Sequence, residues 1–458
     1  MRAFAIVTTL LIAAIGTADA QTRQPRTDIE LRATYAPLVE ATAPAVVNIF
    51  TSRTVQTRSV FDDPFFSQFF GQRPGGRTRQ QTSLGSGVIL ASDGIIVTNN
   101  HVIDGMDEIK VVLADRREFE ATLLLADEQT DLAILKVETP DPLPTLRFAD
   151  SDEAKVGDIV LAIGNPFGVG QTVTSGIVSA LSRTNVSMSD FQFFIQTDAA
   201  INPGNSGGAL IDVDGNLLGV NTAIYSRSGG SNGVGFAIPG SVVQRVLASA
   251  VGGETVVRRP WIGVLGSDVN ASIATALGLD RPRGALINRL FDGGPAERAG
   301  LEEGDVILSI AGQDVQDADA LRYRPATREV GETVEIRYLR EGKERRSRVK
   351  LALPPEDPKR DLTLLRGEHI LTGVTIANLS PALNEELGRN PFDRGVVVTS
   401  LDRRVVNRRV PVREQYLILD INGEAMETVG DVQRAVKKGV QTITVRNTRG
   451  RTSTYRIR

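Results

Sequence analysis

The C-terminal part of the chain repeats itself, and this repeat limits the folds that the chain can adopt. Three short segments occur twice in the same order, 110 or 111 residues apart. They are Trp261-Ile262-Gly263-Val264 and Leu371-Thr372-Gly373-Val374, Arg283-Gly284-Ala285 and Arg394-Gly395-Val396, and Ile310-Ala311-Gly312 and Ile421-Asn422-Gly423. A long-period repeat indicates a repeated structural unit. We therefore expect two related domains, residues 256–353 and 362–458, behind an N-terminal domain of residues 21–255.

A serine among glycines marks the N-terminal domain, in the segment Gly204-Asn205-Ser206-Gly207-Gly208. A serine hydroxyl is a weak nucleophile and needs an adjacent base, most often a histidine that a carboxylate orients. The chain has only two histidines, His101 and His369. The order His, Asp, Ser is the chymotrypsin type, whereas Ser, Asp, His is the α/β-hydrolase type. His101 and His369 therefore predict different folds.

The residues around Ser206 favour the first order. Gly204, Ser206 and Gly208 also fit the nucleophile elbow, which needs a strand before the serine and a helix after it. Here a loop-like run, 197–203, precedes the serine, and two apolar runs, 209–213 and 216–220, follow it around an Asp-Gly turn. That pattern predicts a β-hairpin.

Short apolar runs separated by Gly and Asp turns also lie upstream of Ser206. We expect strands in residues 87–90, 94–98, 110–113, 119–125 and 131–137, and a helix in residues 241–250. His101 follows the second of these strands, and Asp131 begins the fifth. The order His101, Asp131, Ser206 on many short strands predicts a mainly β fold with a pair of β-barrels.

Several motifs together resemble one family. They are Gly85-Ser86-Gly87-Val88-Ile89, Val97-Thr98-Asn99-Asn100-His101-Val102-Ile103, Thr130-Asp131-Leu132-Ala133, Ile163-Gly164-Asn165-Pro166-Phe167-Gly168 and Asp198-Ala199-Ala200-Ile201-Asn202-Pro203-Gly204-Asn205-Ser206-Gly207-Gly208. In this order they resemble the HtrA family of trypsin-like serine proteases, in its DegP/DegQ-like bacterial branch. The resemblance implies a chymotrypsin-like double β-barrel with the triad His101, Asp131 and Ser206. On spacing alone Asp104, Asp107, Asp127 and Glu128 compete with Asp131. His369 is interpreted as a surface-loop residue.

The chemistry of the site follows from the residue types. His101 would accept the Ser206 proton and pass it to the leaving amine, while Asp131 would orient the imidazole. Gly204, Asn205 and Ser206 form the expected oxyanion segment, with the amides of Gly204 and Ser206 as donors. Thr222-Ala223-Ile224-Tyr225-Ser226 and residues 201–203 match family segments that line the substrate cleft. Neither segment contains an acidic residue to pair with a basic substrate side chain, and the nearest acidic residue is Asp198. We therefore expect a preference for small or medium apolar side chains at P1, the residue before the cut bond.

The two repeated domains resemble PDZ domains. In the first, Gly294-Pro295-Ala296 and residues 299–307 match the family's helix-turn-strand signature. PDZ domains bind C-terminal peptides as an added strand, so Trp261, Ile262, Gly263, Val264 and Leu265 become candidate peptide-binding residues. Trp261 can equally well have a packing role. The second domain is degenerate, because the arginine-rich residues 402–411 replace the signature, and assembly is favoured over peptide capture there.

Composition and the N-terminus narrow the function further. Lys and Arg number 52 against 55 Asp and Glu, and cysteine is absent, so we expect no nucleic-acid partner and no disulfide. Neither a zinc motif nor a P-loop occurs, so no metal, ATP or other cofactor is expected.

Residues 1–20 have the pattern of a cleavable signal peptide, with an uncleaved anchor as the alternative. No stable membrane anchor is expected, and a Gram-negative source would place the protein in the periplasm.

A phenylalanine-rich segment precedes the first protease motif. Five of the 16 phenylalanines lie in residues 61–70, within an expected regulatory loop of about residues 53–83. In the family this region is a mobile loop that reaches an active site or a neighbouring subunit, and a local lid is the alternative. The resemblance implies a homotrimer or a multiple of three. The expected function is an ATP-independent endopeptidase acting on unfolded or damaged proteins, with a peptide-binding chaperone of marginal proteolysis as the alternative.

Overall fold

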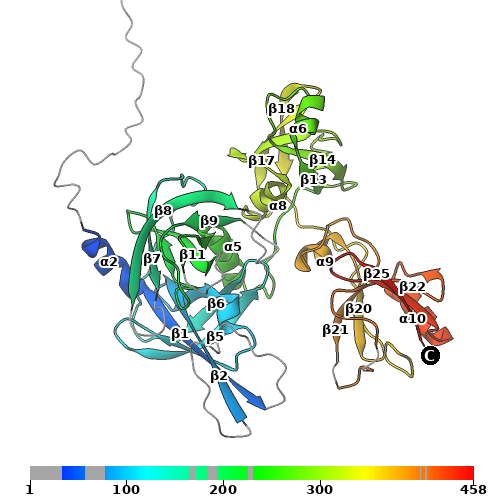
Figure 1. Ribbon diagram of the computed structural model, residues 1–458, viewed down its shortest axis with the longest axis horizontal. Helices are drawn as coiled ribbons and strands as arrows, with labels where there is room; N and C mark the ends of the chain where they lie inside the picture. Colours follow the sequence, from blue (N-terminus) through cyan, green and yellow to red (C-terminus); the bar gives the residue numbers. More distant parts are fainter. Residues whose placement is uncertain are drawn as a thin grey trace, which may run out of the picture.

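The fold is mainly β, with two barrels followed by two smaller α+β units (Figure 1). A computed structural model of the chain describes residues 34–56, 78–164, 171–183, 193–224, 231–402, 404–407 and 410–457. Both barrels are closed and have six strands each. The predicted pair of β-barrels is therefore confirmed. The proposed signal peptide and the phenylalanine-rich residues 61–70 lie outside the described residues.

The first barrel has the strand order β1-β2-β3-β6-β5-β4. Its strands are β1 Val46–Gln56, β2 Thr78–Ala91, β3 Ile95–Asn99, β4 Glu108–Val112, β5 Glu118–Asp127 and β6 Leu132–Val137. Two short helices, α2 Ala36–Thr42 and η1 Ala43–Ala45, precede it, and α4 Asn100–Ile103 follows β3. All residues of β3 are buried, as expected for a short continuous apolar run in a barrel wall. Its C-terminal end delivers His101 to the edge of the barrel.

The second barrel has the strand order β10-β11-β12-β9-β8-β7. Its strands are β7 Ile159–Gly164, β8 Thr172–Arg183, β9 Phe194–Thr197, β10 Ala209–Ile211, β11 Leu217–Ile224 and β12 Gly235–Pro239. The helix α5 Gly240–Val251 closes the unit. β10 and β11 pair antiparallel directly after Ser206. The hairpin predicted after the serine is therefore present, and no helix follows the serine.

The elements predicted upstream of Ser206 agree with the structure except at their ends. Gly94, in the turn before β3, has φ 100°, and an added Cβ would lie 2.3 Å from the carbonyl oxygen of Val137. A side chain therefore cannot be accommodated at this turn. Asp131 lies just before β6 and has φ 56°, in the left-handed region. It ends a turn rather than beginning a strand.

The first repeated unit is an antiparallel sheet with three helices. Its elements are β13 Val264–Asp268, α6 Ala271–Ala276, β14 Ala285–Leu290, α7 Pro295–Arg298, β15 Val306–Ile310, β16 Gln313–Asp314, α8 Ala318–Ala326, β17 Thr333–Arg340 and β18 Lys343–Lys350. The strand order is β13-β14-β15-β17-β18, with β16 paired to β15. β13 is thus an edge strand of the sheet.

The second repeated unit has the same order of strands, with one addition. Its elements are β19 Thr363–Leu364, β20 Val374–Asn378, α9 Pro381–Glu386, β21 Val396–Leu401, β22 Leu417–Ile421, β23 Glu424–Ala425, α10 Val429–Lys438, β24 Thr442–Arg446 and β25 Thr452–Arg456. The order is β19-β20-β21-β22-β24-β25. β20 corresponds to β13, but β19 pairs with its outer edge.

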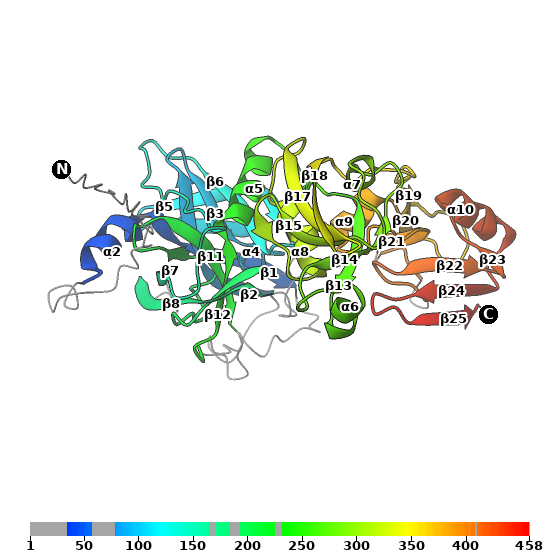
Figure 2. The same cartoon turned by 90° about the horizontal axis from the view of Figure 1, so that it is seen from above.

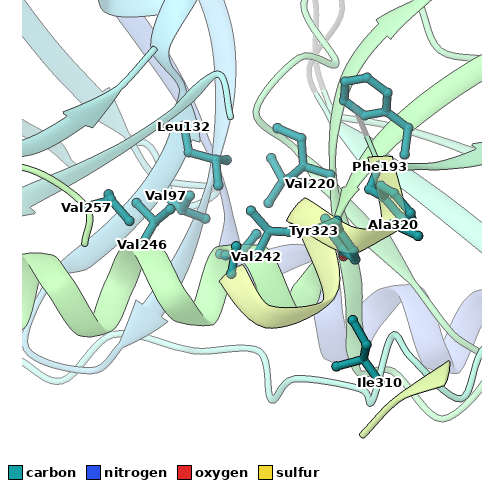
Figure 3. Close-up of a cluster of buried hydrophobic side chains, with 14 of the residues drawn as sticks. Val97, Leu132, Phe193, Val220, Val242, Val246, Val257, Ile310, Ala320 and Tyr323 are labelled. Carbon is teal, nitrogen blue, oxygen red and sulfur yellow. The ribbon is translucent and has the colours of Figure 1, made fainter. Parts of the chain in front are cut away.

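The first repeated unit packs against the barrels, and Figure 2 shows the units side by side along the molecule. The rings of Phe193 and Tyr323 stack with centroids 3.8 Å apart, and Figure 3 shows Ala320 and Tyr323 of α8 beside Phe193. Burial raises the pKa of the Tyr323 phenol, so it remains a neutral hydroxyl whose oxygen lies 3.4 Å from that of Ser241.

Among the described residues, none of the helices has both the length and the apolar character that a membrane span requires.

Candidate active site

The candidate catalytic residues meet at the junction of the two barrels. His101 lies on α4 and Asp131 lies just before β6, so both come from the first barrel. Ser206 precedes β10, and Thr222 lies on β11, so these two come from the second barrel. The structure thus brings together groups that are far apart in the sequence.

The imidazole of His101 is held by Asp131. Nδ1 of His101 lies 2.7 Å from Oδ2 of Asp131, and the backbone N–H of His101 donates to Oδ1 at 2.9 Å. An ionised carboxylate can only accept hydrogen bonds, so Nδ1 carries the proton and Nε2 has its lone pair free. This tautomer is the one that a general base requires. The His101 side chain is half-exposed, which leaves Nε2 accessible.

The backbone of Asp131 is held in its strained conformation by two further hydrogen bonds. Its carbonyl oxygen accepts from Asn99 Nδ2 at 2.9 Å and from the N–H of Asn100 at 3.0 Å. A left-handed conformation is costly for aspartate and persists where surrounding contacts determine it. Asp127, one of the competing carboxylates, instead pairs with Arg259 and accepts from Thr130. Asp131 is therefore the carboxylate that reaches His101.

Thr222 contacts both halves of the site, a role that the sequence interpretation missed. Its hydroxyl donates to Oδ2 of Asp131 at 2.7 Å, and its carbonyl oxygen accepts from Oγ of Ser206 at 3.0 Å. The register between β11 and β12 shifts between Asn221 and Ala223, at the position of Thr222. Such a bulge redirects a side chain out of the regular alternation. The sequence placed Thr222 only among the cleft residues.

The hydroxyl of Ser206 has a partner other than His101 in this conformation. Among the residues that the structure describes, Ser206 Oγ forms its hydrogen bond with Thr222, and none joins it to His101. Catalytic hydrogen bonds are often long or misaligned without substrate. A rotation about the Ser206 side-chain torsion is the motion that would break the Thr222 contact and redirect the hydroxyl.

The turn around Ser206 leaves two backbone donors free. Gly204 has φ 102°, and within the described ranges the N–H groups of Gly204 and Ser206 have no acceptor. Asn205, which the sequence placed in the oxyanion segment, differs, because its N–H donates to the carbonyl oxygen of Asn202 at 2.9 Å. The Asn205 amide is therefore committed to the turn. The candidate oxyanion donors are therefore the amides of Gly204 and Ser206, the two that the sequence analysis named.

Ser86 of the first barrel fixes the orientation of this turn. Its hydroxyl donates to the carbonyl oxygen of Gly204 at 2.6 Å, and its N–H donates to the carbonyl oxygen of Ser206 at 2.8 Å. Next to it, an added Cβ at Gly207 would lie 2.0 Å from the Ser86 carbonyl oxygen. Because both carbonyls are tied to Ser86, the peptide planes of the turn cannot rotate freely. Glycine at position 207 is required by the same close approach.

Two residues considered from the sequence for the substrate cleft, Ile201 and Asp198, differ in their surroundings. Ile201 is buried, and its side chain lies against Gly235 of β12, where an added Cβ would meet Ile201 Cδ1 at 2.8 Å. Asp198, the acidic residue considered from the sequence, is exposed, and its Oδ1 accepts from the N–H of Ile177 at 2.7 Å. It does not supply a buried negative charge. Ala223 and Ile224 end β11, while Tyr225 and Ser226 lie outside the described residues.

The predicted peptide-binding loop of the first repeated unit precedes β13. Trp261 is buried, and its backbone N–H donates to the Ala352 carbonyl oxygen at 2.9 Å. The centroid of its ring lies 5.3 Å from that of the Phe291 ring. Trp261 therefore has the packing role. The N–H groups of Ile262 and Gly263 have no acceptor within residues 231–402.

Val264 and Leu265, the remaining candidates from the sequence, begin β13 and pair with β14. Within residues 231–402 β13 pairs only with β14, so its other edge is open to an added strand.

His369 lies far along the chain from the candidate triad, in the second repeated unit. It lies between β19 and β20, where its Nε2 is 3.2 Å from the carbonyl oxygen of Arg366. A loop position is what the sequence predicted for it. The α/β-hydrolase order also requires a helix after Ser206, and the β10–β11 hairpin occupies that place.

Comparisons with known proteins agree with this architecture. Residues 85–220 match the family model of the trypsin-like peptidase domain, and residues 260–351 match that of the PDZ domain. The probable periplasmic serine endoprotease DegP-like of Marinomonas sp. is 41% identical over 420 residues, which cover 88% of each chain. The periplasmic serine endoprotease DegP of Escherichia coli K12 is 34% identical over 444 residues, covering 92% of this chain and 90% of the relative.

A solved structure shows the same relationship. The HtrA-type protease AlgW with a decapeptide is 44% identical, with a TM-score of 0.52, and the match covers 70% of this chain and 99% of that chain. The fold, the matched domains and these relatives together define a trypsin-like serine endopeptidase that carries PDZ domains. The chain belongs to the HtrA family, and its relatives within that family are DegP-like endoproteases.

Proposed function

We propose that this HtrA protease is an exported, ATP-independent endopeptidase of unfolded or damaged proteins, with Ser206 as nucleophile, His101 as general base and Asp131 as the residue that orients His101. The observation that carries these roles is one connected set of hydrogen bonds, from His101 to Asp131, from Asp131 to Thr222, and from Thr222 to Ser206. Nucleophile, base and orienting carboxylate are the three parts that acyl transfer needs.

In the proposed reaction, the Ser206 hydroxyl leaves the Thr222 carbonyl and turns toward His101 Nε2. His101 accepts the proton as Ser206 attacks the peptide carbonyl, and it then protonates the leaving amine. Asp131 stabilises the imidazolium that forms, and Thr222 holds the Asp131 oxygen in place. Water repeats the same sequence on the acyl-enzyme, and Ser206 is regenerated.

Stabilisation of the tetrahedral oxyanion is assigned to the free amides of Gly204 and Ser206. One such donor contributes about 3 kcal/mol of transition-state stabilisation in comparable sites. Two observations support this assignment: Ser86 anchors the turn through the carbonyl oxygens of Gly204 and Ser206, and the N–H groups of Gly204 and Ser206 have no acceptor within the described residues.

The first PDZ domain is the proposed tether for substrate or activating C-terminal peptides. Two observations within residues 231–402 support this proposal: the amides of Ile262 and Gly263 have no acceptor, which suits a terminal carboxylate, and β13 has an open edge, which suits the backbone of an added peptide strand. Engagement of this domain is proposed to raise protease activity. Its close packing on the barrels through Phe193 and Tyr323 supplies a physical connection.

Location and assembly are further parts of the proposal. The relatives named above are called periplasmic, and residues 1–20 have the signal-peptide pattern, so we place the mature protein in the periplasm. We also propose a homotrimer or a multiple of three. Light scattering decides this point, since a monomer at micromolar concentration contradicts the proposed assembly.

The proposed mechanism is tested by casein degradation. Ser206→Ala removes the nucleophile without opening a core cavity, so we expect loss of proteolysis with an unchanged melting temperature. His101→Ala should be nearly as inactive, and the double variant should lose little more, because triad members act as a unit. His369→Ala, the matched control at the other histidine, should remain active. Undiminished casein cleavage by Ser206→Ala contradicts the mechanism.

A further inference from the structure

The two PDZ units differ at one edge of their sheets. In the first unit β13 has an open outer edge within residues 231–402. In the second unit the corresponding strand, β20, is paired on that edge with β19, in an antiparallel register of Thr363 with Ile376 and Leu364 with Thr375. A segment of the chain itself thus lies where a PDZ domain adds the strand of its peptide.

This segment, residues 359–365, follows β20 over its whole length. Asn378 at the far end donates its N–H to the carbonyl oxygen of Arg360 at 2.7 Å and its Nδ2 to that of Lys359 at 2.9 Å. At the near end the N–H of Leu365 donates to the carbonyl oxygen of Val374 at 2.9 Å. The segment runs toward the loop 371–373, as a peptide does whose C-terminus is held by that loop.

The loop amides make the comparison specific. Ile262 and Gly263, whose amides are free in the first unit, correspond to Thr372 and Gly373 in the second. There the N–H of Gly373 donates to the carbonyl oxygen of Leu365 at 2.9 Å, and that of Thr372 donates to the carbonyl oxygen of His369 at 3.1 Å. The Leu365 carbonyl oxygen therefore takes the place of a terminal carboxylate oxygen.

The side chain of Leu365 completes the resemblance to a bound peptide. Leu365 is 3% exposed and belongs to the buried cluster of the second unit, which also contains Val429, Val432 and Val436 of α10. Its neighbour Leu364 is 40% exposed. One leucine of the segment thus fills an apolar site between sheet and helix, while the adjacent leucine faces solvent.

We propose that residues 359–365 are a built-in ligand of the second PDZ unit, which closes its groove to external peptides, and that the groove accepts an extended peptide with a C-terminal leucine once this segment is displaced. The chain then has one open peptide groove, in the first unit, and one occupied groove, in the second.

The covalent link explains why the groove stays closed. Leu365 is joined to β20 by residues 366–373, and a short link holds a ligand at an effective concentration on the order of millimolar. An external peptide of equal intrinsic affinity at ~10 µM would occupy roughly one hundredth of the second grooves. Weakening the built-in ligand removes this competition.

The test uses the full chain with Ser206→Ala, so that the probe is not cut. The probe is a photo-crosslinking peptide, Asp-Leu-Thr-Leu-Leu with a free carboxylate, and mass spectrometry locates the label. The test variant is Leu365→Ala, which empties the apolar site. Leu364→Ala is the matched control, since it makes the same change at the exposed neighbour.

The expected result is label in residues 256–353 for the parent chain and for Leu364→Ala. For Leu365→Ala we expect at least tenfold more label in residues 362–458. Hydrogen exchange should show that Gly373 loses protection in Leu365→Ala and regains it with peptide, while Ile443 in β24 stays protected.

Two results overturn the proposal: equal labelling of the second unit in the parent chain and in Leu365→Ala, or a folded Leu365→Ala that takes up no peptide. If Leu365→Ala unfolds the unit, the same labelling experiment is done with Leu365→Val, which removes one methylene. Labelling of the second unit equal to that in the parent chain, or a folded variant that takes up no peptide, then overturns the proposal. The readout is independent of proteolysis, so a failure of the proposed catalytic mechanism leaves this test valid.

Discussion

Removing the Thr222 hydroxyl is the sharpest test of how the catalytic site is held together. In Thr222→Val the side chain keeps its shape, and the backbone carbonyl that accepts from Ser206 remains. Only the 2.7 Å hydrogen bond to Oδ2 of Asp131 is lost. The variant therefore separates the support of Asp131 from every other feature of the site.

The size of the effect follows from the surroundings of Asp131. A hydrogen bond to a charged group contributes about 1.5–3 kcal/mol. The Asp131 side chain is 21% exposed, so water can replace part of the lost interaction, and the lower end of this range applies. About 1.5 kcal/mol corresponds to a roughly tenfold decrease in kcat/KM. Because the contact orients the catalytic base rather than the substrate, we expect the decrease in kcat and little change in KM.

The assay is steady-state cleavage of a fluorogenic peptide, with the melting temperature measured in parallel. Thr122→Val is the matched control, because Thr122 lies on β5, is exposed and makes a long 3.4 Å contact to the carbonyl oxygen of Lys136. It should retain full activity. If Thr222→Val were as active as the parent enzyme while remaining folded, the positioning role of Thr222 would be wrong. A rise in KM at constant kcat would assign Thr222 to the substrate cleft alone.

Three further variants probe the turn, the second barrel and the domain contact. Ser86→Ala leaves the Gly204 carbonyl without its 2.6 Å donor, so we expect kcat to fall about tenfold in the same peptide assay, while Ser52→Ala at a half-buried serine outside the site has no effect, and unchanged kcat would contradict the role of Ser86. Ile201→Ala leaves a buried cavity beside Gly235 and should destabilise the second barrel by about 3 kcal/mol, seen as a lower melting temperature, while peptide mapping of casein digested by the parent should show small or medium apolar P1 residues, and cleavage chiefly after Lys or Arg would refute this preference. Tyr323→Ala removes the ring stacked 3.8 Å from Phe193 and should destabilise the contact between barrels and first PDZ unit by about 3 kcal/mol, seen as faster limited proteolysis near residues 252–254. Tyr323→Phe keeps the ring and should behave like the parent, and equal proteolysis of all three chains would contradict the contact.

Local patterns in the sequence were enough to predict the barrels and the neighbourhood of the serine. Short apolar runs between Gly and Asp turns indicate strands, and the hairpin after Ser206 follows from its Asp-Gly turn. The pairing of His101 with Asp131 was expected only from the family resemblance, because several carboxylates had similar spacing. The folded chain distinguishes them by contact, since Asp131, held by Asn99 and Asn100, is the carboxylate that is hydrogen-bonded to His101.

The features that the sequence could not predict depend on contacts between distant residues. Thr222 is an ordinary strand residue until the barrels place it beside Asp131, 91 residues earlier in the chain. The hydrogen bond from the Asn205 N–H to the Asn202 carbonyl oxygen depends on a turn geometry that composition does not specify. β19 has only two residues, too few for a recognisable alternation, so the occupied edge of the second PDZ unit was visible only in the folded chain.

The contacts that hold the site cross the junction of the two barrels. Ser86 of the first barrel fixes the turn of Ser206 in the second, and Thr222 of the second barrel supports Asp131 of the first. Neither barrel alone therefore holds a complete set of oriented groups. Because the positions of Ser206 and Asp131 depend on the fit between the barrels, a change that loosens the junction should reduce activity before it unfolds either barrel. Activity in this enzyme thus reports the packing of two units, which gives any partner bound near the junction a direct way to alter catalysis.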